Sequence, residues 1–295
     1  MGKMSMGLRR IFESAVQHRA ISLDAIMKAK RQAENLPGNP SIKKLVASGS
    51  DPQHAVYVNT LNLISLFCEQ AATLLPLHKI NDFMAKWQEI YQPAFPPMSP
   101  ITGSFFNCWT LLDAAFGPDK ETVGTCFLAI ADRLGLDAMQ IQVAKNLNQS
   151  RMGLYEVIQR KGQGKFSELR ELITDKRFTT YFPSGYQGNP GDILWVRLVP
   201  PLSDSVDYYV AMTTPYRLLL QTTADWLQYF ERHGIRPGAT GVEAKLHAHM
   251  KYGKNPSYWS EFIFYGYSNY AADVILLTGF PDQPQTQPAH REYRH

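Results

Sequence analysis

The sequence predicts an α+β fold in which helical sequence lies on both sides of a small antiparallel β-sheet or barrel. Residues 151–220 hold five or six short alternating, β-branched or aromatic runs, separated by turns rich in Gly, Pro and Asp. The sequence on either side shows apolar residues at helical spacing instead. We expect a helical domain over 1–150, a β module over 151–220, helices packing on that module over 221–280, and a flexible tail over 281–295.

The strands of the β module are predicted from alternation and from the turns that end each run. Residues 154–160 alternate with the period of a strand, and the two glycines of 161–165 permit a tight turn. Residues 193–199 give the strongest strand pattern, and Pro200 and Pro201 end it because proline has no N–H to donate. Both faces of this strand are apolar, so both must be covered. Further strands are expected over 166–173, 178–182, 208–213 and 216–220.

The helices before the β module are predicted from apolar stripes and capping residues. Ser22 is a capping residue that would divide the first stretch, and Asp51 precedes a proline in the first turn of another helix. No repeat at a fixed period is present, so a solenoid is not predicted. The expected helices cover 4–36 (one long or broken helix), 52–75, 77–91, 105–116, 121–134 and 137–147.

The helices after the β module are shorter and more aromatic. Thr222 or Thr223 caps a helix that runs through Phe230, and Gly234 ends it. A second helix is expected over 240–250, and a third, aromatic on all sides, over 257–269. Residues 274–277 fit either a helix end or a strand.

Composition excludes several classes of protein. The chain has 295 residues, of which 44% are hydrophobic, as in ordinary globular proteins. Its three cysteines are far apart and show no zinc-binding spacing, which favours a reducing, cytoplasmic compartment. The N-terminus lacks the apolar core of a signal peptide, and polar residues interrupt the most apolar helix. We therefore expect no membrane segment and no cofactor.

The positive charge is concentrated at the N-terminus. Residues 1–50 contain nine Lys or Arg and only three Asp or Glu, whereas the whole chain has a net charge of just +4. A basic segment of this kind binds nucleic acid or an acidic protein partner. A solvated helix face explains the same charge pattern, and both interpretations are open.

A basic and aromatic surface on the β module is the main binding hypothesis. Its rings and turn cations resemble in composition the mix used by nucleic-acid-binding barrels, in which bases stack on rings and cations follow phosphates. In the alternative interpretation the rings face the helices and the charges only solubilise the turns. The candidate ligand-binding residues are Tyr155, Arg160, Lys161, Lys165, Trp195 and Arg197, with Phe178, Tyr181, Tyr186, Tyr208, Lys176 and Arg177 completing the pattern.

The candidate metal site consists of Glu243 and His247. These residues are four apart and share one face of the expected helix, so both side chains could bind the same metal ion. A solvated helix with local charge pairs explains the same pattern.

No motif fixes a reaction. Ser184 lies in a turn without the flanking glycines of a nucleophile elbow, and 161–165 lacks the leading glycine of a phosphate-binding loop. We therefore expect a non-catalytic binding or adaptor protein whose partner is a protein or a nucleic acid. The alternative is a hydrolase-type enzyme with a pocket between the β module and the C-terminal helices, using His247 or Glu243.

Overall fold

The computed structural model describes residues 7–17, 22–33, 42–74, 82, 85–89, 99–117, 119–162, 165–186, 188–271 and 273–282. The chain divides into two compact units, one formed by 1–87 and 107–149 and the other by 88–106 and 150–295. Most of the helix expected over 77–91, and the tail from 283 onward, lie outside the described residues. The division at 150, 220 and 280 stays a prediction.

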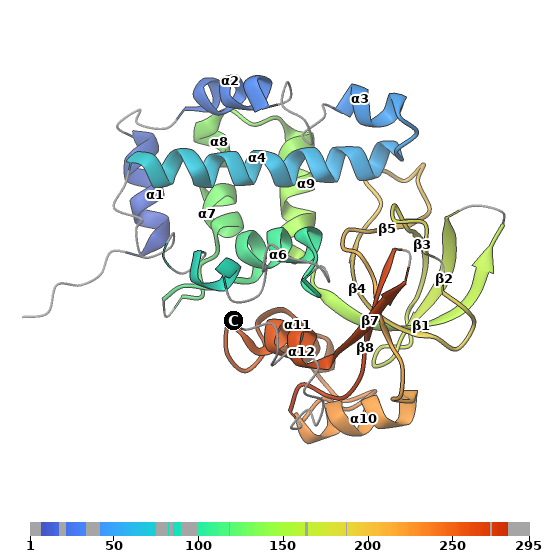
Figure 1. Ribbon diagram of the computed structural model, residues 1–295. Coiled ribbons are helices and arrows are strands. Elements are labelled where there is room, and N and C mark those ends of the chain that lie inside the picture. Colours follow the sequence, from blue (N-terminus) through green and yellow to red (C-terminus); the bar gives the residue numbers. More distant parts are fainter. Residues whose placement is uncertain are drawn as a thin grey trace, which may run out of the picture. The chain divides into compact units, whose positions relative to one another are not determined.

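The first unit is helical. The long helix α4 contacts α1, α2, α3, α7 and α9, and Figure 1 shows it running through the middle of this unit. The Ser22 hydroxyl accepts a hydrogen bond from the Ala25 N–H at 3.2 Å, so the expected first helix is broken into two. The elements are α1 (Leu8–Gln17), α2 (Leu23–Ala33), α3 (Ile42–Ala47), α4 (Pro52–Leu74), α7 (Val123–Ala129), α8 (Ala131–Leu134), α9 (Ala138–Gln149) and the π-helical turn η1 (Trp109–Asp113).

Aromatic residues fill the centre of this unit. Phe67 contacts Phe12 and Phe127, with ring centroids 4.8 and 5.3 Å apart. The boundary between the two units lies within the short helix α6 (Gly103–Cys108), which continues into η1, so the helix expected over 105–116 changes from α-helical to π-helical after Cys108. The helix expected over 121–134 is divided into α7 and α8, and Thr122 caps the first of them.

The second unit is built on a closed five-stranded barrel. Its strand order is β1-β2-β3-β5-β4, and an additional β1–β4 pairing closes the ring. Strands β6, β8 and β7 extend the sheet from β4. The strands are β1 (Met152–Lys161), β2 (Phe166–Glu171), β3 (Arg177–Tyr181), β4 (Ile193–Val199), β5 (Tyr209–Ala211), β6 (Tyr216–Leu218), β7 (Tyr267–Ala271) and β8 (Val274–Leu277). The predicted α+β fold with a small central barrel and flanking helices is confirmed.

Two pairings in the sheet are parallel, unlike the wholly antiparallel sheet that the sequence predicts. Strands β3 and β5 run parallel and complete the barrel, while β6 and β8 run parallel outside it. Parallel neighbours need a crossover connection, and the three C-terminal helices supply the one between β6 and β8. The barrel order, with its single parallel β3–β5 pair, is the topology of the OB-fold, a five-stranded Greek-key barrel.

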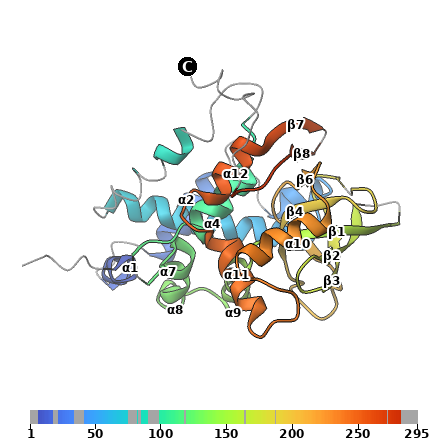
Figure 2. The same cartoon turned by 90° about the horizontal axis from the view of Figure 1, so that it is seen from below.

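Up to residue 282, three helices follow the barrel: α10 (Thr223–Arg232), α11 (Val242–Tyr252) and α12 (Tyr258–Gly266). Thr222 and Asp225 form a reciprocal cap at the start of α10, and α11 contacts β1. Figure 2 shows the three helices in orange to red. The helix expected over 257–269 runs three residues too far at its C-terminal end. Residues 267–269 are in β7, because pairing with β8 replaces the helical hydrogen bonds after Gly266.

Both faces of β4 are buried, as its apolar pattern predicts. The residues facing the barrel interior pack in one cluster, formed by Tyr155, Val157, Leu169, Phe182, Leu194, Val196, Leu198 and Ala211. On the opposite face Trp195 packs against Phe105 of α6 and Trp259 of α12. Among the described residues, no helix is long and apolar enough to span a membrane.

Candidate binding surface on the barrel

On the outer surface of β1, β2 and β3, polar and aromatic side chains lie opposite one another on neighbouring strands. On β2, Ser167 and Leu169 are fully buried, whereas the alternate residues are only partly buried. Lys161 of β1 lies opposite Phe166, which lies opposite Tyr181 of β3. We call this surface the β1–β3 face, and it consists of Lys161, Phe166, Glu168, Arg170, Arg177, Thr179 and Tyr181, of which Tyr181 is buried and the others are at least partly exposed.

One end of the β1–β3 face is aromatic. The Phe166 ring lies 5.2 Å from Tyr181 and 5.1 Å from Tyr208, centroid to centroid, and meets Tyr208 edge to face. Tyr208 comes from the loop between β4 and β5, so the cluster joins that loop to the start of β2. The sequence pattern included Tyr181 and Tyr208 but missed Phe166. The alternation of Phe166, Glu168 and Arg170 was the signal that places its ring on the outer surface.

Glu168 lies between the cations at the middle of the face. Its carboxylate accepts hydrogen bonds from Gln159 at 2.6 Å and from Arg177 at 3.2 Å, and lies 3.9 Å from the Lys161 ammonium. The Gln159 hydrogen bond is the main cause that holds the pKa of Glu168 below its ordinary value, and both cations add to it. Lys161 also donates to the Thr179 hydroxyl at 2.7 Å.

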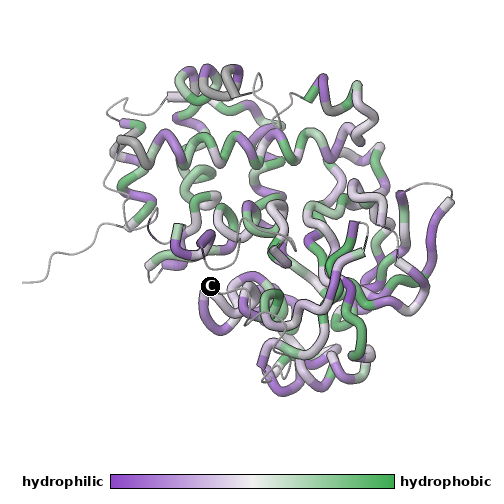
Figure 3. Tube along the Cα trace, in the orientation of Figure 1, coloured by the Kyte–Doolittle hydropathy of each residue, from purple (hydrophilic) through white to green (hydrophobic). Residues whose placement is uncertain are grey.

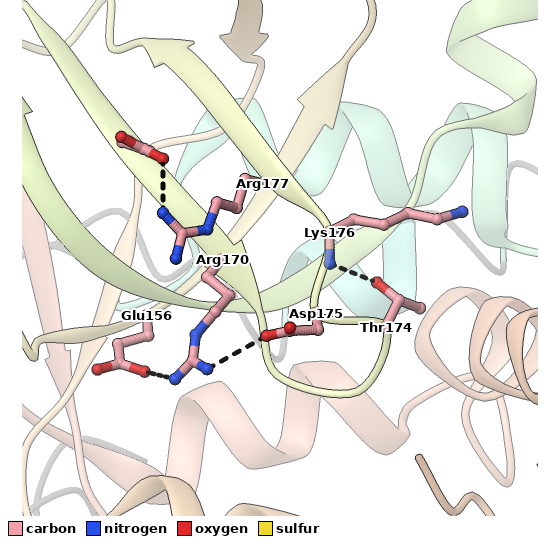
Figure 4. A network of polar contacts seen from close by, with 7 residues as sticks. Glu156, Arg170, Thr174, Asp175, Lys176 and Arg177 are labelled. Atoms are coloured by element: carbon pink, nitrogen blue, oxygen red, sulfur yellow. Dashed lines mark hydrogen bonds and ion pairs between the residues drawn. The ribbon is translucent and has the colours of Figure 1, made fainter. Parts of the chain in front are cut away.

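A second network surrounds the β2–β3 turn. Figure 4 shows Arg170 between the carboxylates of Glu156 and Asp175, and the Glu156 hydrogen bond is the main cause that raises the pKa of Arg170. The Lys176 ammonium pairs with Glu243 of α11 at 2.8 Å. Over residues 156–177 the chain contains six Lys or Arg and four Asp or Glu, and Glu171 is buried. The exposed part of this segment is therefore cationic, and Figure 3 shows hydrophilic residues along the β1–β2 hairpin.

The predicted ligand-binding residues fall into two groups. Arg160, Lys161 and Lys165 lie at the surface, near the β1–β2 turn. Arg160 donates to the Gly188 carbonyl and the Asn189 side chain, each at 2.7 Å, and Lys165 donates to the Pro183 carbonyl at 3.2 Å. These two cations therefore fasten the loop between β3 and β4.

The other three predicted ligand-binding residues lie in the interior. Tyr155 belongs to the barrel core, and burial raises the pKa of its phenol above the ordinary value. Trp195 and Arg197 are fully buried on the other side of β4, where Arg197 donates to the Ser150 carbonyl and hydroxyl at 3.0 Å. A ligand on the barrel surface has no access to them in this conformation.

Glu243 and His247, the candidate metal ligands, lie on α11 in different surroundings. The Glu243 side chain is 65% exposed and pairs with Lys176. His247 is partly buried, and burial, followed by the charges of Lys251, Arg151 and Arg197, lowers its pKa to about 4. No three His, Cys, Asp or Glu side chains within the described residues gather closely enough to hold a metal ion. The metal and hydrolase hypotheses stay predictions without geometric support.

Comparison with known proteins does not indicate a function for this chain. No protein-family model, curated protein or solved structure matches this chain. A shared strand order alone does not imply a shared function, because one fold hosts many unrelated sites. A function can therefore be inferred only from the chemistry of the β1–β3 face.

Proposed function

We propose that this protein binds single-stranded nucleic acid on the β1–β3 face of its barrel. The observation that carries the proposal is the pair of partly exposed rings Phe166 and Tyr208, which contact the buried Tyr181 ring and lie beside Lys161 and Lys165. Unpaired bases stack on such rings, while neighbouring cations contact the phosphates. A neutral polymer could stack on the rings but would not be attracted by the cations. The presence of rings and cations side by side therefore favours a polyanion.

The place of the cluster on the barrel supports the same ligand. OB-fold barrels bind oligonucleotides and oligosaccharides on the face of their second and third strands and with the loops joining strands 1 to 2 and 4 to 5. Here β2 and β3 supply Phe166 and Tyr181, the β4–β5 loop supplies Tyr208, and the β1–β2 turn supplies Lys165. The ring contacts read no base identity, so we expect binding with little sequence preference.

Removing two cations from the β1–β3 face and one from the adjoining β1–β2 turn tests the electrostatic part of the proposal. We expect the triple variant Lys161→Ala, Lys165→Ala, Arg177→Ala to bind a fluorescent 20-nucleotide oligo-dT or oligo-U at least about 30-fold more weakly in anisotropy titrations at low salt. The slope of log affinity against log salt should fall by about 2, at about 0.7 for each lost phosphate contact.

The control for this triple variant is Arg236→Ala, Lys245→Ala, which removes exposed cations from outside the β1–β3 face. Its affinity for the oligonucleotide should stay within about twofold of the wild type, since surface cations away from the bound oligonucleotide contribute only long-range attraction. Equal weakening by both variants, or no binding of either oligonucleotide by the wild type, would show the proposed surface to be wrong.

Removing rings tests the stacking part separately. Phe166→Ala with Tyr208→Ala should weaken oligonucleotide binding about tenfold or more, since each stacked base contributes about 1–3 kcal/mol, while the salt slope stays unchanged. Tyr265→Ala with Tyr270→Ala is the matched control, because both tyrosines are exposed outside the face. A weakened salt slope in the ring variant would mean that the barrel surface had been disrupted rather than a stacking platform removed.

Glu168 is expected to oppose the ligand. Phosphates must compete with its carboxylate for Arg177 and Lys161, so Glu168→Gln should tighten oligonucleotide binding about fivefold at low salt, the range of one or two exposed ion pairs. Glu231→Gln, which removes an exposed carboxylate paired with Arg236, should leave the affinity unchanged. The same titrations measure both, and weaker binding by Glu168→Gln would contradict a phosphate site at this position.

A further inference from the structure

Away from the β1–β3 face, two histidines stack between the C-terminal helices. The His233 ring, directly after α10, lies 4.7 Å from the His249 ring of α11, with their planes 27° apart. The Tyr229 hydroxyl of α10 lies 2.8 Å from His249 Nε2 and 2.8 Å from the Tyr258 hydroxyl of α12. One polar cluster therefore joins all three helices.

This cluster favours uncharged imidazole rings. Burial, followed by the neighbouring His233 and Lys254, lowers the pKa of His249 to about 4. Burial, followed by Lys254, also lowers the pKa of His233. Burial raises the pKa of the Tyr258 phenol to about 12 and raises that of Tyr229 as well, so both phenols stay protonated.

The charged groups around the two histidines do not offset the effect of burial on their pKa values. Asp282 lies 3.3 Å from His233 Nε2 and favours the protonated ring, but Arg232 shares this carboxylate at 3.3 Å. Lys254 lies over the Tyr258 ring at 5.7 Å and repels a proton on either histidine. Two stacked rings cannot both take a positive charge without mutual repulsion.

We propose that the stacked histidines are a pH-sensitive lock, which holds α10 on α11 and α12 near neutral pH and releases it on acidification. With the rings separated and solvated, each histidine takes up a proton near its ordinary pKa of about 6.5. The closed arrangement binds fewer protons than the open one, so falling pH below that value shifts the equilibrium toward the open arrangement.

Opening would also free the last described residues of the chain. The Phe280 ring lies 4.8 Å from the Trp226 ring and stacks on Tyr229, both of α10. Asp282 is held by Arg232 and His233 at the end of the same helix. Separation of α10 from its neighbours therefore removes the contacts that hold residues 280–282 in place.

Hydrogen exchange followed by mass spectrometry tests the lock on the intact protein. Exchange times are scaled for the intrinsic rate at pH 7.0 and pH 4.8, and peptides covering α10, α11 and β1 are compared. We expect protection in α10 and α11 to fall at least tenfold at the lower pH while β1 keeps its protection. A loss of protection in β1 at the same step would mean general acid unfolding and would overturn the proposal.

Two variants distinguish the effect of protonating the stacked pair from that of protonating another histidine. His233→Phe with His249→Phe keeps flat rings but cannot be protonated, so its exchange in α10 should not change with pH. His247→Phe is the matched control, because it removes another histidine of low pKa on α11 and should leave the opening as in the wild type. Opening of the double variant with the wild-type pH dependence would overturn the proposal.

A measurement on the wild type covers the case in which the double variant does not fold. In NMR spectra of protein labelled in the histidine rings, the His233 and His249 signals should start to titrate only where the α10 amides lose protection. Titration of either ring near pH 6.5 while α10 stays protected would show that protonation and opening are independent.

Discussion

Replacing Trp195 with alanine should lower the free energy of unfolding by about 3–5 kcal/mol, the range for removing a large aromatic side chain from a core. The Trp195 side chain is fully buried, and its ring lies 5.2 Å from Trp259 and 5.3 Å from Tyr216. These contacts join β4 to β6 and to α12, so the cavity would lie where the barrel meets its helices. Urea denaturation followed by far-UV circular dichroism measures the change.

The size of this effect separates a core residue from a ligand-binding one. Trp195→Phe, which keeps a ring at this position, should lose less than half as much stability as Trp195→Ala. Tyr265→Ala, at an exposed position, should stay within about 0.5 kcal/mol of the wild type. A Trp195→Ala protein as stable as the wild type would mean that this side chain is not part of the core.

Replacing Gly253 with alanine should lower the free energy of unfolding by about 2–4 kcal/mol, from backbone strain and overpacking together. Gly253 ends α11 with φ +60° and ψ −158°, a conformation that residues with a side chain rarely adopt. A Cβ atom there would also lie 2.6 Å from the Cβ of Tyr258, at the start of α12. The alanine variant must therefore change the turn that brings Tyr258 to Tyr229.

Gly234→Ala is the matched control for this glycine. Gly234 also has a positive φ, of +69°, but a Cβ built there meets no atom within 4 Å. Thermal or urea unfolding should show a loss of about 1–2 kcal/mol, the cost of the left-handed conformation alone. Equal losses in the two variants would mean that the contact with Tyr258 adds nothing.

Local sequence signals determined most of the secondary structure. Alternation and proline placed β4 at 193–199, where the structure has it, and Thr222 began α10 as its capping chemistry requires. The helix end at 266 shows where local signals fail. Residues 267–269 continue an aromatic pattern that fits a helix, but they pair with β8, the next strand in the chain, which is itself held in the sheet by the sequence-distant β6.

The candidate surface could be predicted only in part. Lys161 and Tyr181 were found from composition, because turn cations and strand aromatics are visible in the sequence. Composition could not show that Trp195 faces helices or that Glu168 lies among the cations, since both depend on which strands are neighbours. The alternation over 166–170 was enough to place Phe166 on the outer surface, but its contact with Tyr208 depends on the fold.

By itself, the sequence determined that a compact sheet lies in the middle of the chain with helices before and after it, because hydrophobic period and turn residues act over short distances. Only the tertiary structure decided the closure of the barrel through β1 and β4, the parallel β3–β5 pair, and the meeting of His233 with His249. Each of these joins segments far apart in the sequence, where strand register and packing, rather than local preference, fix the neighbours.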